Sequence, residues 1–144
     1  MDQKNEELAI SRRTAICALS LISVGIFTSA ESAVAATGVK VLANGKVQVT
    51  LKDNPALKKV GGVVRIDDVQ GRSIALVRSS AKTYVAVNLL CTHQGGQLFQ
   101  NGNQWQCEVH GATFTLAGKN LVGPATTALK QLPIKATASV VTIG

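Results

Sequence analysis

Both histidines of this 144-residue chain, and two of its three cysteines, lie within residues 91–111. They form two short boxes, Cys91-Thr92-His93 and Cys107-Glu108-Val109-His110. Thiolate and imidazole are the side chains that hold iron, zinc and copper in proteins. This concentration predicts a metal centre, and any fold that the chain adopts has to bring the two boxes together.

The spacing within the boxes predicts irregular loops and not helices. Neighbours on a helix face are three or four residues apart, whereas Cys91 and His93 are two apart. Glycine tolerates the sharp backbone turns that such loops need, and Gly95, Gly96 and Gly111 follow the ligands. Two loops that each give one sulfur and one nitrogen fit a binuclear centre, in which one iron takes both cysteines and the other takes both histidines.

At these residues the chain resembles the Rieske iron–sulfur proteins, whose motifs are Cys-x-His-x-Gly and Cys-x-x-His-Gly on two facing loops. The resemblance covers residues 60–140 and extends to a proline loop over the cluster, at Gly123-Pro124-Ala125, with Val122 and Ala125 expected to shield the cluster from water. It implies one 2Fe-2S cluster per chain, with two cysteines on the inner iron and two histidines on the outer iron: Cys91, Cys107, His93 and His110.

The residues beside the boxes predict a reduction potential in the lower or middle part of the family's range of about −150 to +300 mV. High-potential, quinol-oxidising members add one cysteine to each box, and the two form a disulfide; Gly96 and Val109 stand in those places here. Those members also have a serine and a tyrosine whose hydroxyls bond to the cluster sulfurs, where this chain has Ala112 and Phe114. Hydrogen bonds to sulfur stabilise the reduced cluster, so their absence lowers the potential.

The sequence leaves two other interpretations of the four cysteine and histidine side chains open. A structural zinc site of two cysteines and two histidines would use the same residue types and predicts a colourless, non-redox β-domain. Zinc modules favour Cys-x2-4-Cys and His-x3-5-His spacings, and neither spacing occurs in the boxes. In the second reading the four side chains merely pack together without a metal.

The function that the resemblance implies is one-electron transfer through the histidine edge, with His93 and His110 as electron exit and proton-sensitive groups. Such a chain is an electron carrier with no catalytic site of its own. A Rieske oxygenase also needs an iron held by two histidines and a carboxylate, and the chain has no third histidine. The alternative is the iron–sulfur small subunit of an exported oxidoreductase or quinol–cytochrome complex.

Residues 1–36 are predicted to be an export signal. Ser11-Arg12-Arg13-Thr14 precedes an apolar run, and Ala33-Val34-Ala35 supplies the small residues of a cleavage site. The paired arginines resemble the twin-arginine signal, whose route carries folded cargo and therefore suits a cofactor inserted in the cytoplasm. The prediction is a periplasmic protein. An ordinary secretory signal, and a signal kept as a membrane anchor facing the periplasm, are the alternatives.

Residues 37–144 are expected to form one small, basic domain. They hold twelve Lys and Arg against four Asp and Glu, a net charge of +8. Such a surface attracts redox partner proteins with an acidic docking face. Nucleic acid is a poor match because the charges are scattered and aromatic residues are few. Lys58 and Lys59 are expected to form a solvated turn.

Alternating hydrophobicity predicts β-strands along nearly the whole domain. Asn44-Gly45 and Asn101-Gly102 are hairpin signals, the first for a type I′ turn. The second lies between the two boxes and should bring them onto neighbouring loops. The prediction is an all-β, antiparallel sandwich or barrel of the Rieske type, with both cluster-binding loops at one end. The expected strands are residues 39–42, 47–51, 63–66, 74–78, 84–90, 113–116, 129–134 and 139–143.

Overall fold

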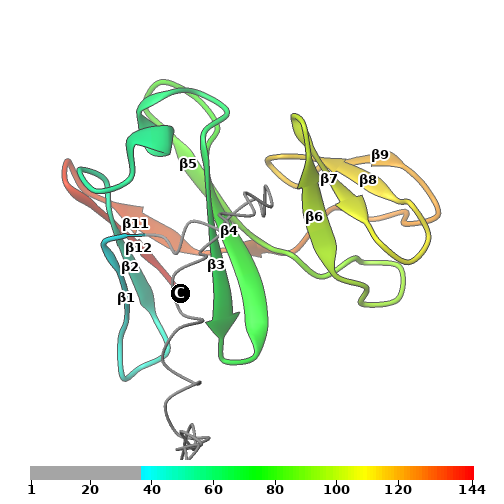
Figure 1. The fold of residues 1–144 in the computed structure, drawn as a ribbon, viewed down its shortest axis with the longest axis horizontal. Coiled ribbons are helices and arrows are strands. Elements are labelled where there is room, and N and C mark those ends of the chain that lie inside the picture. The colour runs from blue at the N-terminus through cyan, green and yellow to red at the C-terminus, as the bar shows by residue number, and fades with distance from the viewer. Residues whose placement is uncertain (1–36) are drawn as a thin grey trace, which may run out of the picture. The chain divides into compact units, whose positions relative to one another are not determined.

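The computed structural model describes residues 37–144, and the predicted export signal lies outside the described residues. The described chain contains strands and one short 3₁₀ helix, so the all-β prediction is confirmed (Figure 1). None of its helices is long and apolar enough to span a membrane. The elements are β1 (Val39–Val41), β2 (Val47–Thr50), η1 (Pro55–Lys58), β3 (Val63–Val69), β4 (Arg72–Arg78), β5 (Tyr84–Asn88), β6 (Leu98–Asn101), β7 (Gln104–Cys107), β8 (Thr113–Thr115), β9 (Asn120–Val122), β10 (Gln131–Leu132), β11 (Ile134–Ala136) and β12 (Val140–Ile143).

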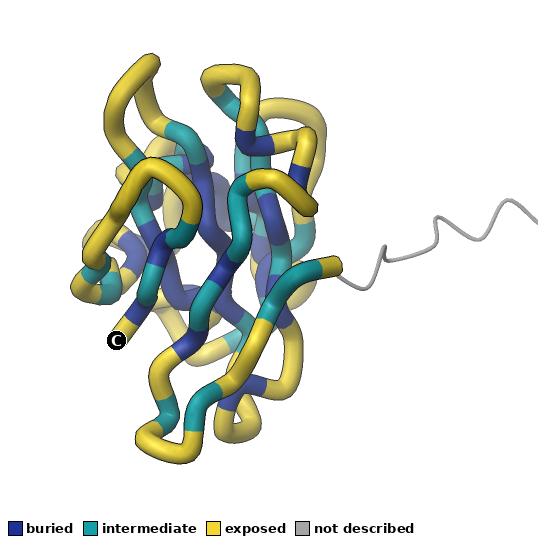
Figure 2. The backbone as a smooth tube through the Cα atoms, turned by 90° about the vertical axis from the view of Figure 1, so that its left-hand side faces the viewer, coloured by how far each residue is buried: buried dark blue, intermediate teal, exposed yellow. Residues whose placement is uncertain are grey.

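The strands form three four-stranded antiparallel sheets, in the orders β1-β2-β12-β11, β10-β5-β4-β3 and β6-β7-β8-β9. The first two share one hydrophobic core, to which each strand gives every second residue, as the period of a strand requires (Figure 2). Val47 and Val49 of β2 are buried there, opposite Ile143 and Val141 of β12. The matching face of the second sheet supplies Val64, Ile66, Ile74, Leu76 and Ala86.

The middle sheet also packs against the sheet β6-β7-β8-β9, which carries the ligand loops. Its opposite face supplies Ala75, Val77 and Val87 to a second core, where they join Trp105 and Phe114. Because this sheet is covered on both faces, β4 is buried without interruption from residue 74 to residue 77. The second core positions the ligand loops, since it is continuous with the two cysteines.

The two predicted hairpins form, but the turn type predicted for the first is wrong. A type I′ turn needs positive φ at both central residues, and only Gly45 of the Asn44-Gly45 pair has one, at 76°. The second hairpin joins β6 to β7, with Asn101 paired to Gln104 and Gly102 at φ 59°. This hairpin connects the two boxes, as the sequence predicted.

Two strand predictions near the C-terminus are corrected. Residues 129–134 were expected to be one strand, but Pro133 divides β10, which pairs with β5, from β11, which pairs with β12. Proline has no N–H to give to a ladder, so the chain changes sheets there. Strand β9 was not predicted, because Asn120-Leu121-Val122 does not alternate between polar and apolar residues.

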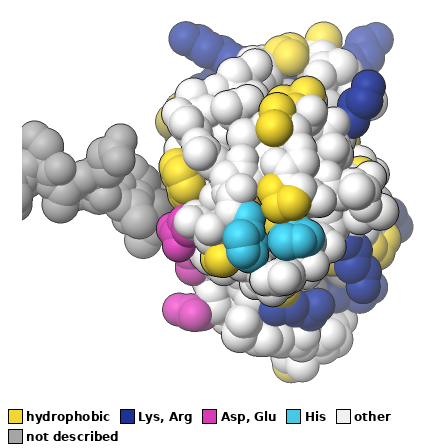
Figure 3. Space-filling model, turned by 90° about the vertical axis from the view of Figure 1, so that its right-hand side faces the viewer, with side chains coloured by type: hydrophobic (Ala, Val, Ile, Leu, Met, Phe, Trp, Pro, Cys, Tyr) yellow, Lys and Arg dark blue, Asp and Glu magenta, His cyan; other side chains and the backbone are white. Residues whose placement is uncertain are grey.

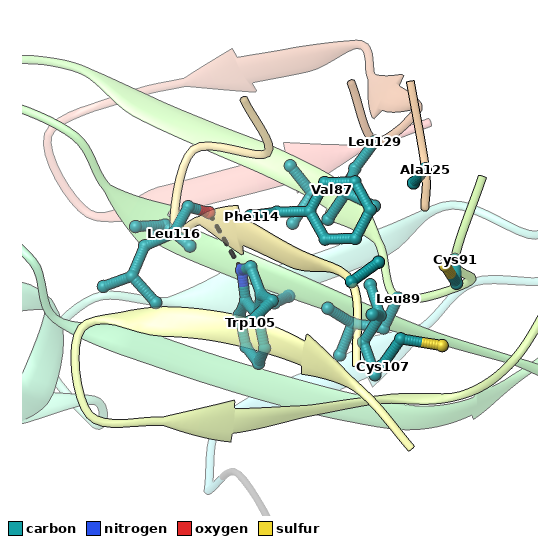
Figure 4. Packing of buried hydrophobic residues seen from close by; sticks show 13 residues of the cluster. Val87, Leu89, Cys91, Trp105, Cys107, Phe114, Leu116, Ala125 and Leu129 are labelled. Atoms are coloured by element: carbon teal, nitrogen blue, oxygen red, sulfur yellow. Dashed lines mark hydrogen bonds between the residues drawn. The ribbon is translucent and has the colours of Figure 1, made fainter. Parts of the chain in front are cut away.

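Replacing Trp105 by phenylalanine is expected to lower the free energy of unfolding by about 2 kcal/mol. Trp105 is fully buried, and its Nε1–H donates to the carbonyl oxygen of Leu116 at 3.1 Å (Figure 4). Phenylalanine leaves that buried carbonyl without its donor and leaves space beside it. Urea denaturation of the cluster-loaded protein measures the change, and an unaltered midpoint would contradict the assigned role of this hydrogen bond.

Candidate metal centre

The two boxes fold into loops that share one backbone form. In the first loop the Cys91 N–H donates to the carbonyl of Gly96 at 2.8 Å, and the Gly95 N–H donates back to the carbonyl of Cys91 at 2.8 Å. Both turning glycines have φ 72°, a left-handed conformation that glycine adopts without strain. The second loop repeats the two bonds at 2.8 and 3.1 Å, with the corresponding residues Cys107, Ala112 and Gly111.

The β6–β7 hairpin holds the two loops face to face. Leu98 at the start of β6 pairs with Cys107 at the end of β7. The Glu108 N–H of the second loop donates to the carbonyl of Gln97, at the exit of the first loop, at 3.3 Å. The Thr92 hydroxyl donates to the carbonyl of Thr127 at 2.8 Å, a contact that the sequence gave no reason to expect. The first loop is therefore tied to both the second loop and the proline loop.

The two cysteines lie on the inner side of this site. Cys91 is 3% exposed and Cys107 is 2% exposed, and both belong to the same core as Trp105 and Phe114. In Figure 4 the cysteines lie at one side of that core, and Trp105 lies at the other. Neither cysteine forms a disulfide, so both thiols are available as ligands.

The two histidines lie side by side on the outer surface (Figure 3). Their Nδ1 atoms are 3.3 Å apart, and their rings meet edge to face, with 4.9 Å between centroids and 82° between planes. Two nitrogens bound at about 2.05 Å to one tetrahedral metal ion lie about 3.3 Å from each other. The spacing of the His93 and His110 Nδ1 atoms therefore fits two ligands of a single ion.

The donor set as a whole fits two metal ions better than one. Among residues 37–144, no group of three or more His, Cys, Asp or Glu side chains is placed to hold a single ion. A structural zinc site needs four donors around one ion. Here two buried thiols and two exposed imidazoles form separate pairs, which fits a binuclear iron–sulfur cluster with two thiolate and two imidazole ligands.

Burial and the backbone N–H groups of the loops act in opposite directions on the pKa values of the two thiols. Burial raises the pKa of Cys91, and the neighbouring Cys107 adds to this, against the opposing effect of the His93 N–H. Burial also acts to raise the pKa of Cys107, but the N–H groups of His110 and Val109 outweigh it and leave this pKa lowered. The same N–H groups would stabilise a sulfur atom that carries negative charge.

Gly96 has a different role from the one expected. Its backbone is not in the left-handed region, so the turn itself does not require glycine there. A Cβ atom at this position would lie 2.9 Å from the Cys107 Sγ and 2.7 Å from the Cγ2 of Val109. Glycine is needed because the second loop approaches so closely, and positions 96 and 109 face each other across the site.

The proline loop shields the site only in part as expected. Ala125 is 3% exposed and packs in the core with the cysteines. Val122, which was expected to shield the cluster, is 58% exposed. It lies on β9, the edge strand of its sheet, where one side of the strand faces solvent.

An all-β domain with paired cysteine and histidine loops at one end defines a binuclear iron–sulfur protein. Residues 43–133 match the family model described as the Rieske [2Fe-2S] domain, which is more than half of the chain. The chain belongs to this family. A Rieske domain binds one 2Fe-2S cluster per chain, so the predicted cofactor is confirmed at the level of the family.

Solved structures of similar fold agree with this assignment. The plasma membrane Rieske protein PetC3 of the cyanobacterium Synechocystis PCC 6803 is 26% identical, with a TM-score of 0.53 over 66% of this chain and 94% of that protein. The quaternary ammonium Rieske monooxygenase CntA is 19% identical, with a TM-score of 0.53 over 62% of this chain. This chain covers 30% of the monooxygenase, and the likeness shows the fold alone. No curated protein sequence matches the chain.

Proposed function

We propose that this chain is an exported one-electron carrier whose 2Fe-2S cluster is held by Cys91, Cys107, His93 and His110. The observation that carries the proposal is the arrangement of two exposed imidazoles outside two buried thiols. A cluster held in this way is insulated on the cysteine side and reachable from the histidine side. The cofactor supplies reversible one-electron chemistry when it is bound, and the chain supplies its insulation and its contact surface.

The histidines provide the contact surface. The two Nδ1 atoms lie 3.3 Å apart, which leaves the opposite, Nε2 edge of each ring to a partner. Val109, between the second cysteine and its histidine, is 59% exposed, and Leu90 is 36% exposed. This combination of ring edges and small apolar side chains suits a transient contact with a redox partner protein.

The core side of the site excludes water. Leu89, Leu98 and Ala112 are each fully buried in the core that contains the cysteines. Apolar neighbours provide no hydroxyl donors to sulfur, which favours the oxidised, less negative cluster. The proposed reduction potential is therefore in the lower or middle part of the family range of about −150 to +300 mV.

Replacing Ala112 by serine is expected to raise the potential by about 40 mV, which corresponds to roughly 1 kcal/mol for one electron. Ala112 is fully buried directly after the second box, and its carbonyl already bonds to the Cys107 N–H. A hydroxyl here supplies a donor on the sulfur side. A redox titration followed by electron spin resonance measures the shift. Ala117→Ser, two residues beyond the end of β8, is the control and should leave the potential unchanged.

The proposal also concerns the export of the chain and whether it acts alone or as a subunit of a complex. The paired arginines and the small residues of the 1–36 segment support transport through the twin-arginine route into the periplasm. A second candidate is the iron–sulfur subunit of a membrane-linked oxidoreductase. The similarity to PetC3, described as a plasma membrane protein, over 94% of its length favours this candidate. Size-exclusion chromatography of native extract separates a small carrier from a large assembly.

The deciding experiment is spectroscopy of the protein purified from its own cell fraction. We expect a coloured protein with equal amounts of iron and acid-labile sulfide. After reduction with dithionite it should give the low average g value of a histidine-ligated cluster. A colourless protein that contains zinc in place of iron would refute the proposal. Mass spectrometry of the purified chain locates its N-terminus and tests cleavage near residue 36.

A further inference from the structure

Three of the four acidic side chains in residues 37–144 lie at the end of the domain that carries the histidines. Of the four acids in residues 37–144, Glu108 lies in the second ligand loop, and Asp67 and Asp68 lie at the end of β3 near the exit to the first loop. The negative charges of these acids balance the positive charges of Arg65 and Arg72 at the same end. Arg65 forms an ion pair with Asp67 at 2.9 Å. The acidic side chains lie to one side of the histidines in Figure 3. Lys and Arg side chains lie on another side of the histidines in the same view, so the surface around the histidines is mixed in charge.

A group of exposed lysines occupies the opposite end of the middle sheet. We call this group the lysine end: Lys58 and Lys59 at the end of η1, and Lys82 in the loop between β4 and β5. Arg78 joins the two loops, because its guanidinium donates to the carbonyl of Leu57 at 2.8 Å and also to the carbonyl of Ala81. Each accepting residue directly precedes a lysine of the group. These lysines are thus held on adjacent, protruding loops (Figure 1).

The lysines have no acidic partners in the described part of the chain. The ion pair between Arg65 and Asp67 is the one that residues 37–144 contain. The nearest acid in sequence, Asp53, precedes η1 and lies against Gly38 beside β1. The charges of the lysine end are consequently not neutralised within the domain.

Exposed apolar surface lies beside these charges. Val60 directly follows the lysine pair and is 61% exposed. It lines a groove of about 530 Å³ together with Val77, Leu116 and Leu121, and Leu121 is 50% exposed. A surface that combines lysines with protruding aliphatic side chains can contact both the headgroups and the upper acyl region of a lipid bilayer.

The lysine end and the histidine surface lie at opposite ends of β5. Tyr84 at its start pairs with Arg78, and Asn88 at its end pairs with Ile74. The chain then runs on to Cys91. At about 3.3 Å per residue, the seven steps from Tyr84 to Cys91 span roughly 23 Å. A surface bound at the lysine end therefore leaves the histidines free.

We propose that the lysine end binds the anionic headgroups of a lipid bilayer and turns the histidine surface away from it. Lysine is a compact charge on a flexible stem and suits mobile phosphate groups, whereas fixed carboxylates of a protein favour the bidentate fork of arginine. The one arginine here uses its guanidinium on backbone carbonyls. The proposal concerns contact by the domain itself and is independent of the cluster and of any anchoring by residues 1–36.

Sedimentation with vesicles tests the proposal on the full, cluster-loaded chain. For each variant, the affinity for vesicles that contain phosphatidylglycerol is divided by the affinity for pure phosphatidylcholine vesicles. This ratio removes any contribution of residues 1–36 that is the same for both kinds of vesicle. Each lysine near an anionic surface contributes about fivefold to affinity, so K58Q/K59Q/K82Q should lose about 100-fold. High salt should produce a similar loss.

The control is K40Q/K46Q/K135Q, which removes three exposed lysines on β1, on the β1–β2 turn and on β11 and changes the net charge equally. We expect it to retain binding, and Val60→Ser to weaken binding at unchanged charge. Equal losses in both triple variants would overturn the proposal, because net charge alone would then explain binding. The proposal would also be overturned if the parent chain showed no preference for anionic vesicles but bound immobilised polyglutamate through these lysines. That result would assign the surface to an acidic protein.

Discussion

Replacing Cys107 by serine is expected to remove the iron–sulfur cluster almost completely while the β-sheets persist. Cys107 is 2% exposed, and the N–H groups of His110 and Val109 face its sulfur. A serine hydroxyl is a far poorer iron ligand than a thiolate, so removing the proposed inner ligand should prevent the chain from holding the cluster. Iron and acid-labile sulfide analysis, together with the visible absorption spectrum, measures the loss.

Two comparisons separate the loss of a ligand from the loss of the fold. Far-ultraviolet circular dichroism of Cys107→Ser should retain the β-sheet signal, because Leu98 and Trp105 hold the β6–β7 hairpin in the core independently of the sulfur. Glu108→Gln changes an exposed neighbour in the same loop and should keep the full cluster content. A Cys107→Ser variant with undiminished colour would exclude Cys107 as a ligand.

The features that the sequence predicted well are local ones. A cysteine and a histidine two or three residues apart define a loop by themselves, and Gly95 and Gly111 take the left-handed conformation that such loops require. The Asn101-Gly102 hairpin is likewise a property of neighbouring residues. These signals were sufficient to bring the two boxes together, since the hairpin lies between them in the chain.

The features that were missed depend on what approaches from elsewhere in the fold. Gly96 looked like a turn residue, but the constraint on it comes from Val109 and Cys107 of the other loop. The strand predicted for residues 129–134 is divided at Pro133 because the residues on its two sides pair with strands of two different sheets. The location of three of the four acids near the ligand loops also follows from sheet order, because the sequence shows Asp67 and Glu108 only as scattered charges.

Replacing Gly96 and Val109 together by cysteine is expected to produce a disulfide that clamps the two ligand loops. A Cβ atom at position 96 would lie 3.4 Å from the Cβ of Val109. Cβ atoms joined by a disulfide are about 3.5–4.5 Å apart, so the loops need to separate by only a few tenths of an ångström. The bond would close a loop of 14 residues, which corresponds to about 3 kcal/mol of added stability in the chain-entropy description.

Chemical denaturation of the cluster-loaded double variant, with and without a thiol reductant, measures this gain. The midpoint should rise only under oxidising conditions, and mass spectrometry should show the loss of two hydrogens relative to the reduced chain. The single variant Gly96→Ala is the informative control, because its Cβ still meets the Val109 Cγ2 at 2.7 Å, a contact that Val109→Cys removes, and it gains no new bond. It should hold less cluster than the parent chain.

The close approach of Cys107 makes the double variant a strict test of the geometry. If the new cysteine at position 96 faces position 109, the disulfide forms between them and both cluster ligands stay free to hold iron. If the new cysteine at position 96 faces Cys107 instead, a disulfide to Cys107 forms and the cluster is lost. Peptide mapping distinguishes these two products, and the second would show that the loops lie closer at the ligands than at their outer residues.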